Sequence, residues 1–402
     1  MSSDTHVLPL ILTKLPEKNQ HPCWEKLNSM APPTSKQELW KYTRTSQILQ
    51  ETWQLSEEQK YNTPSPLAQC AGRLVFVNGN FCPQHTLLPK GMKVAVSKNA
   101  YCPFDPTHFF EALSFVYNTC LLDITIDKHA EIEGVVQIEY HHTQEHVFAA
   151  PALRINAGER SRVKFIEYFT ETPHSCLHIR HLELDAADHS HVHIDKIQCG
   201  GLNAFVMNED RITLHANTEF HINTMTISGA WTRNMLHISM MGTHSVAHLN
   251  GFYAPHGREF VDNHTCVYHG THHCESHELY KGLMSDHSTG VFNGRIHVER
   301  DAQKTNAYQS NANLLSGLDA KMYTKPELEI YADDVKCSHG STTGQIDEEA
   351  LFYLKARGLS GERALQLLCE AFFMEIIKGA VSEEVAAHIL KLLAQKGIVH
   401  SD

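Results

Sequence analysis

The stretch KPELEIYADDVKCSHGSTTGQIDEEALFYLKARG, residues 325–358, contains the point at which the hydrophobic pattern of the chain changes. In its first part, ELEIYADDVKC, apolar and polar residues alternate with a period of two, which is typical of a β-strand. In its second part, Asp347 can cap a helix in EEALFYLKAR that ends at Gly358. The stretch therefore predicts a β domain that is followed by helices.

The same alternation recurs upstream in short runs such as CLHIRHLEL, HVHIDKI, RITLHAN and MLHISM. One helical interruption is expected in PTHFFEALSFVYNTC, where Phe109, Leu113 and Val116 share a face. No fixed repeat is visible, so the pattern fits a β-solenoid, a jelly roll or a two-sheet sandwich equally well. The residues predict a large, mainly β domain and leave its architecture open.

Helix signals occur at both ends of the chain. Ser35 and Glu38 form a capping box in PTSKQELWKY, and the prolines of YNTPSPLAQCAG indicate a boundary near residue 72. Ser360 and Ser382 can cap two more helices near the C-terminus. The first of these carries an apolar stripe of Leu365, Leu368, Phe372, Phe373 and Ile376. We expect a helical domain at 1–72, a β domain at 73–339 and a second helical domain at 340–402.

Composition excludes several classes of function. The formal net charge of -12 argues against a nucleic-acid binder, which needs a basic surface. No apolar run approaches the roughly 18 residues that a membrane span needs. The 11 cysteines form no CxxC pair, which favours free thiols and a cytoplasmic protein. The GxxxxGK[ST] phosphate loop does not occur, so we expect no ATP hydrolysis by the chain itself.

The chain is unusually rich in histidine, with 30 residues. In DHSHVHID, a strand would place His189, His191, His193 and Asp195 on one face, as in some cupin metal sites. A cupin-like metalloenzyme that uses these three histidines is therefore one hypothesis, and a solvent-facing ladder of histidines is the other. A second segment, DNHTCVYHGTHHCESHELYKG, adds Cys266 and Cys274, but its spacings match no zinc pattern.

Cys337 and His339 are the remaining candidate ligands. On a strand, residues i and i+2 point to the same face, so the two side chains leave the chain on one side. Thiolate and imidazole suit zinc or the iron of an iron–sulfur cluster, but two ligands do not complete a four-coordinate site. Any such site needs ligands from another segment or chain, and an inert cysteine beside a surface histidine is the alternative.

Several segments together resemble the SufB/SufD family of the Suf iron–sulfur cluster assembly machinery. The resemblance is strongest over residues 280–358 and is also visible in PTSKQELWKYT and RLVFVNGNF. It implies a right-handed parallel β-helix core with N- and C-terminal helical domains, and a non-catalytic scaffold function. The KCSHG turn, with Cys337 and His339, has the SufD form. A SufB-type subunit, which accepts persulfide sulfur, is the alternative within the family.

The resemblance also implies partners and a cofactor. A SufD-type chain pairs with SufB and docks the SufC ATPase through its C-terminal helices, here through the stripe of Leu365, Leu368, Phe372, Phe373 and Ile376. It contributes His339, with Cys337 as its neighbour, to a nascent iron–sulfur cluster shared with SufB. The isolated chain is then expected to hold no tightly bound cluster and can form a homodimer.

Overall fold

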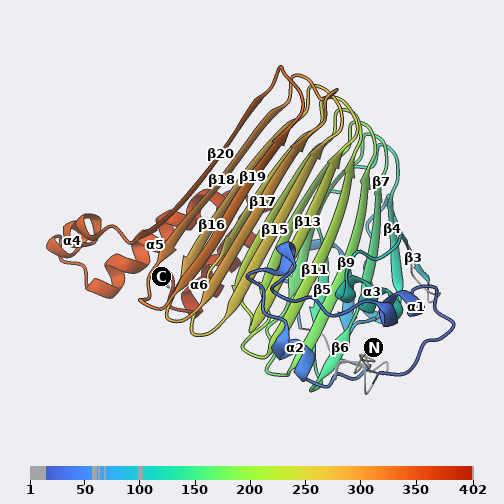
Figure 1. The fold of residues 1–402 in the computed structure, drawn as a ribbon, viewed down its shortest axis with the longest axis horizontal. Coiled ribbons are helices and arrows are strands. Elements are labelled where there is room, and N and C mark those ends of the chain that lie inside the picture. Colours follow the sequence, from blue (N-terminus) through green and yellow to red (C-terminus); the bar gives the residue numbers. More distant parts are fainter. Residues whose placement is uncertain (1–14, 57–60, 62–63, 68, 98–102, 401–402) are drawn as a thin grey trace, which may run out of the picture.

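The structure is a computed structural model that describes residues 15–56, 61, 64–67, 69–97 and 103–400. Two long sheets face each other along most of the molecule (Figure 1). In order, sheet 1 consists of β2 (Asn80–Phe81), β1 (Cys70–Val77), β5 (Val135–His141), β8 (Arg162–Phe169), β10 (His191–Cys199), β12 (Glu219–Ser228), β14 (Val246–Tyr253), β16 (Glu275–Met284), β18 (Asn306–Leu315) and β20 (Lys336–Gln345). Sheet 2 consists of β19 (Lys321–Ile330), β17 (Thr289–Val298), β15 (Phe260–His269), β13 (Trp231–Met240), β11 (Ala204–Leu214), β9 (Cys176–Ala186), β7 (Ala152–Ala157), β4 (Leu121–Ile126) and β3 (Met92–Ser97), with β6 (Val147–Ala149) paired to β9.

The two sheets form a parallel β-helix. From β7 onward, successive strands alternate between the sheets, and each pairs in parallel with the strand one turn earlier. Side chains 30 residues apart therefore become neighbours, as in the 3.1 Å contact between His215 Nε2 and Asp185 Oδ2. This arrangement confirms the parallel β-helix and removes the jelly roll and the sandwich. The sequence shows no repeat because the turns share the length of their strands and the alternation of inward and outward residues, and do not share particular residues.

The strand alternation places one apolar set inside the β-helix. Leu184 of sheet 2 and Ile194 and Leu249 of sheet 1 belong to one buried core between the sheets. The residues that alternate with them along each strand point outward. A different part of the chain covers the outer face of each sheet. Both faces of most strands are covered. Polar residues on the outward side of these strands are therefore buried too, which would not occur in a sheet with one face in water.

The outer face of sheet 2 is covered by residues 15–56 and by α3 (Phe109–Val116). The N-terminal segment contains only α1 (Trp24–Ser29), η2 (Glu38–Trp40) and α2 (Ser46–Gln50), and η3 (Pro83–His85) follows β2. The helix expected from a Ser35 cap is wrong, because η2 has three residues and its N-cap, Gln37, makes no side-chain cap. Trp40 instead packs over the guanidinium of Arg233, 4.1 Å from the ring centroid.

The outer face of sheet 1 is covered by the C-terminal helices. These are α4 (Glu348–Ala356), α5 (Gly361–Ile377) and α6 (Glu383–Gln395), capped by Asp347, Ser360 and Ser382 as expected. Helices thus flank the β-helix at both ends, and α4 projects away from its body (Figure 1). The expected boundary at residue 339 lies inside β20, which continues to Gln345. Among the described residues, no helix is long and apolar enough to cross a membrane.

Candidate metal-ligand site at the open end of the β-helix

Cys337 and His339 lie on β20, the last strand of sheet 1. Within the described part of the chain, β20 pairs only with β18, so its other edge carries unpaired backbone groups. His339 is exposed and Cys337 is half-buried. The strand places both side chains on the same face, as the spacing predicts. The two residues therefore stand at an open edge that another chain can reach.

Cys337 lies beside a small apolar cluster inside the last turn, which includes Val298 and Ala307. Burial raises the pKa of its thiol. Among the described residues, no group of three or more His, Cys, Asp or Glu side chains is placed to hold a metal ion. Cys337 and His339 thus provide two donor types that suit iron, without a third ligand from the described residues.

Gln309 and Glu278 form a buried polar pair on the two strands of sheet 1 nearest to the strand of His339. Gln309 of β18 is the register partner of His339, and its Nε2 donates to Glu278 Oε2 of β16 at 2.7 Å. Gln309 Oε1 is buried and has no hydrogen-bond partner among the described residues. Gly294 leaves room for this amide, because a Cβ there would lie 2.2 Å from Gln309 Nε2. The sequence analysis did not single out Gln309 or Glu278, since inward polar residues in a strand carry no motif.

Burial raises the pKa of Glu278 to about 7 from an ordinary value of 4.5. The folded protein therefore holds a proton that the unfolded chain releases. The resulting stabilisation is complete below pH 4.5 and is lost as the pH rises through 7. Since one pKa unit corresponds to about 1.4 kcal/mol, this group lowers the free energy of unfolding by about 3 kcal/mol between acidic and alkaline pH.

Glu278→Gln is expected to remove most of that pH dependence and to stabilise the protein above pH 7. A neutral amide of the same shape fits the site without an ionisation cost. Urea unfolding at pH 5 and pH 8 measures the effect. Glu275→Gln is the matched control, because Glu275 lies on the same strand with a half-exposed side chain. Equal pH dependence in wild type and Glu278→Gln would contradict the assignment.

The histidine excess forms ladders rather than a metal cluster. On the outer face of sheet 1, neighbouring rings stack in adjacent turns at centroid distances between 4.5 and 5.5 Å. The ladder consists of His193, His221, His248, His277 and Tyr308. Burial and the neighbouring histidines lower the pKa of His248 to about 4, which keeps this ring neutral near pH 7.

The cupin-like hypothesis is wrong in its geometry. His189 lies in a turn with φ 61° before β10, so it does not share the strand face of His191 and His193. His191 contacts Glu219 at 3.0 Å, and His193 contacts Asp195 at 3.1 Å. The three imidazoles therefore have no common point at which they could bind one ion.

The cysteine- and histidine-rich segment 262–277 is also spread over several surfaces. His264 and Cys266 lie on the outer face of sheet 2, where His264 contacts Asp262 at 2.8 Å. His269 and Cys274 point into the β-helix, and His277 belongs to the ladder. The strand and the turn place these residues on different faces of the β-helix, so they form no shared site.

Most of the predicted docking stripe is used by the chain itself. Phe373 and Ile376 are buried with Phe252 of β14 and Leu283 of β16 in the core beneath α5. The stripe residues Leu365, Leu368 and Phe372 are half-buried. The exposed apolar side chains of this region lie elsewhere, at Phe352 and Tyr353 of α4, which are 73% and 57% exposed. The docking role of the stripe stays a prediction.

The cysteines are mostly free thiols, as expected. Among the cysteines that the structure describes, nine are free, namely Cys70, Cys82, Cys120, Cys176, Cys199, Cys266, Cys274, Cys337 and Cys369. Cys23 differs because it is disulfide-bonded. Burial raises the pKa of Cys199 to about 12, which makes this thiol an inert side chain of the core.

Comparison with known proteins places the chain in a family. A family model described as "SUF system FeS cluster assembly, SufBD core domain" matches residues 140–372, which include Cys337 and His339. The iron–sulfur cluster assembly protein SufD of Escherichia coli is 30% identical over 401 residues, covering 95% of this chain and 92% of the relative.

Two other relatives match over shorter lengths. A SufBD family iron–sulfur cluster assembly protein of Synechocystis is 41% identical over 121 residues, which is 30% of this chain and 27% of the relative. Protein ABCI7, chloroplastic, of Arabidopsis thaliana is 33% identical over 172 residues, or 42% of this chain and 36% of the relative. With the parallel β-helix, the family match and the nearly full-length similarity to a SufD, this chain belongs to the SufB/SufD family of iron–sulfur cluster assembly proteins and is SufD-like.

Proposed function

We propose that this chain is a non-catalytic scaffold subunit that provides one side of an iron–sulfur cluster assembly site at its interface with a SufB-type partner. The observation that carries the proposal is the exposed His339 on the open edge of β20, with the half-buried Cys337 on the same face. An exposed edge strand can pair with a strand of another chain. A partner docked there could supply the missing ligands. The cluster is the cargo of this site.

In this proposal His339 binds iron through one nitrogen of its neutral imidazole. The other ring nitrogen then carries a proton and needs an acceptor that fixes the ring. We propose Gln309 Oε1 as this acceptor, because Gln309 is the register partner of His339, its Nε2 already donates to Glu278, and its Oε1 has no partner among the described residues. Cys337 serves as a further ligand in its thiolate form, and its thiol proton is released to the solvent when the metal binds.

The test of the proposal is co-expression with SufB- and SufC-type partners, followed by anaerobic purification and iron and sulfide analysis. We expect a ternary complex that acquires a cluster and an isolated chain that acquires almost none. Stoichiometric iron or zinc in the isolated chain would contradict a shared site.

We further propose that the C-terminal helices dock a SufC-type ATPase mainly through α4. Phe352 and Tyr353 are the exposed aromatic residues there, and aromatic anchors carry much of the energy of protein interfaces. Phe352→Ala combined with Tyr353→Ala is expected to weaken ATPase binding about thirtyfold, as for a loss of about 2 kcal/mol.

Binding of the ATPase can be measured by surface plasmon resonance with the intact chain. Tyr331→Ala is the matched control, because Tyr331 is 58% exposed in the turn between β19 and β20, and α4 follows the opposite end of β20. Phe373→Ala is expected to lower the stability of the chain instead, since Phe373 is buried in its core. Unchanged affinity in the double variant would remove α4 from the docking surface.

A further inference from the structure

A second candidate site lies on the opposite sheet. A groove of about 910 Å³ opens where the N-terminal segment 35–47 passes the first residues of β13, β15, β17 and β19. Its volume falls in the range of small-molecule sites, which is roughly 300–1,000 Å³. His339 lies on sheet 1, whereas this groove lies on the outer face of sheet 2, so the two sites are independent.

The groove concentrates positive charge on a chain whose net charge is -12. Its walls carry Lys41, Arg44, Arg258 and Lys321. Among the described residues, none of these four cations makes an ion pair. The single acidic residue of the lining, Asp319, pairs with His287 at 3.2 Å. All four residues are exposed, and together they give this face of the groove a positive potential that attracts anions.

The wall also contains a polar group that lacks a partner. Trp231 is only 4% exposed and stacks on Phe260 at 6.0 Å and 16°. Its indole Nε1–H is buried and has no hydrogen-bond partner within the described part of the chain. An unsatisfied buried donor is costly, so such a group commonly marks the place of a ligand or an ordered water. A donor beside four cations suits an anionic oxygen.

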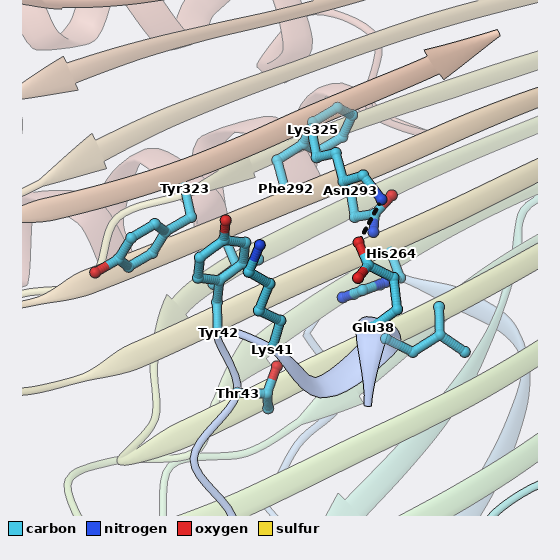
Figure 2. A pocket seen from close by; sticks show the side chains of 11 residues that line it. Glu38, Lys41, Tyr42, Thr43, His264, Phe292, Asn293, Tyr323 and Lys325 are labelled. Carbon is cyan, nitrogen blue, oxygen red and sulfur yellow. Dashed lines mark hydrogen bonds and ion pairs between the residues drawn. The ribbon is translucent and has the colours of Figure 1, made fainter. Parts of the chain in front are cut away.

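The cations come from different parts of the fold. Lys41 and Arg44 lie on the N-terminal segment, Arg258 lies in the turn between β14 and β15, and Lys321 begins β19. Tyr42 and Tyr323 line both this groove and the smaller pocket of Figure 2, and their rings stack at 4.3 Å and 12°. The stack and the ion pair of Lys325 with Glu38 at 2.7 Å hold the segment against sheet 2. The groove is therefore a preformed feature of this packing.

We propose that this groove binds a small molecule that carries a phosphate group. Arginine presents planar pairs of N–H donors that match phosphate oxygens, and lysine adds point charges. Arg44 on the segment and Arg258 on the opposite wall can contact the phosphate from two sides, with Lys41 and Lys321 next to them.

Titration calorimetry of the full chain at low salt tests the proposal, with pyrophosphate and ADP as probes. We expect saturable binding of both probes to one site, with ADP displaced by pyrophosphate. Arg258→Glu and Arg44→Glu should each weaken binding by at least about tenfold, as expected for a lost charged hydrogen bond. Trp231→Phe, which keeps an aromatic ring but removes the N–H, should weaken it roughly tenfold.

Lys36→Glu is the matched control, because Lys36 is an exposed lysine of the same segment outside the groove lining. His339→Ala should bind both probes normally, which separates this site from the cluster site. The proposal is wrong if neither probe binds with a Kd below about 1 mM, which corresponds to a binding free energy of about −4 kcal/mol. It is equally wrong if Lys36→Glu weakens binding as much as Arg258→Glu, or if pyrophosphate fails to displace ADP.

Discussion

Replacing His339 with alanine is expected to abolish cluster formation in the complex while leaving the fold and the assembly of the subunits unchanged. The side chain is exposed on β20, so its removal opens no cavity and exposes no core. It would, however, remove the imidazole ligand that this chain contributes. Loss of a group that only supports a metal ligand already costs about 10–100-fold, so loss of the ligand itself should reduce cluster yield at least as much.

Iron and sulfide content and the visible absorption of the purified complex measure this effect. Ser338→Ala is the control, since Ser338 is also exposed on β20 but points to the opposite face. Cys337→Ser should give an intermediate yield, because its thiol is half-buried. A normal cluster yield with His339→Ala would remove His339 from the site.

Replacing Arg233 with alanine is expected to cause the largest loss of stability. Arg233 is fully buried, bonds to Asp262, donates to Thr43 Oγ1 at 2.9 Å and donates to the Leu39 carbonyl at 2.9 Å. It thus fastens the N-terminal segment to sheet 2. Its removal would leave the Asp262 carboxylate buried without its main partner, which costs about 3–5 kcal/mol.

Guanidinium unfolding and limited proteolysis of residues 30–50 report this loss. Arg295→Ala is the matched control, because its pair with Glu329 is exposed and contributes about 0–1 kcal/mol. The double change Arg233→Met with Asp262→Leu should recover part of the loss, since neither charge then remains buried. A loss of stability no larger than that of Arg295→Ala would contradict the anchoring role.

The interaction of Arg233 and Asp262 also has a predictable response to acid. The guanidinium of Arg233 and the neighbouring His264 lower the pKa of Asp262 to about 2, against the cost of burial. Since the folded pKa is depressed, the stabilisation is present above the ordinary value of 3.8 and is lost as the pH falls through 2. The N-terminal segment is therefore expected to stay anchored in mildly acidic solution.

The sequence was most informative where local chemistry decides structure. Asp347, Ser360 and Ser382 cap their helices as predicted, because each cap needs only its own side chain and the next backbone N–H groups. The capping box at Ser35 failed because Trp40 and Thr43 are held by Arg233 and Asp262, which lie 190 and 219 residues after Thr43. Packing across the β-helix overrode the local helix signal there.

The histidines show a second limit of sequence reasoning. A strand period of two correctly put His191 and His193 on one face, but it could not show that the chain turns at His189. It also could not show that the neighbours of His248 are His221 and His277 from adjacent turns. Contacts between turns depend on register, which is set by the whole solenoid rather than by one segment. The pattern correctly put His339 on the last strand before the helices, but the position of this strand at the sheet edge depends on the pairing of β20 with β18.

The most direct test of the central claim is pulsed electron paramagnetic resonance on the reduced cluster of the complex, with only this chain labelled with ¹⁵N. If His339 ligates iron, the spectrum will show the coupling of one imidazole ¹⁵N, and His339→Gln will lose it. A cluster of normal yield without nitrogen coupling from this chain, or with a coupling that survives His339→Gln, would contradict the claim.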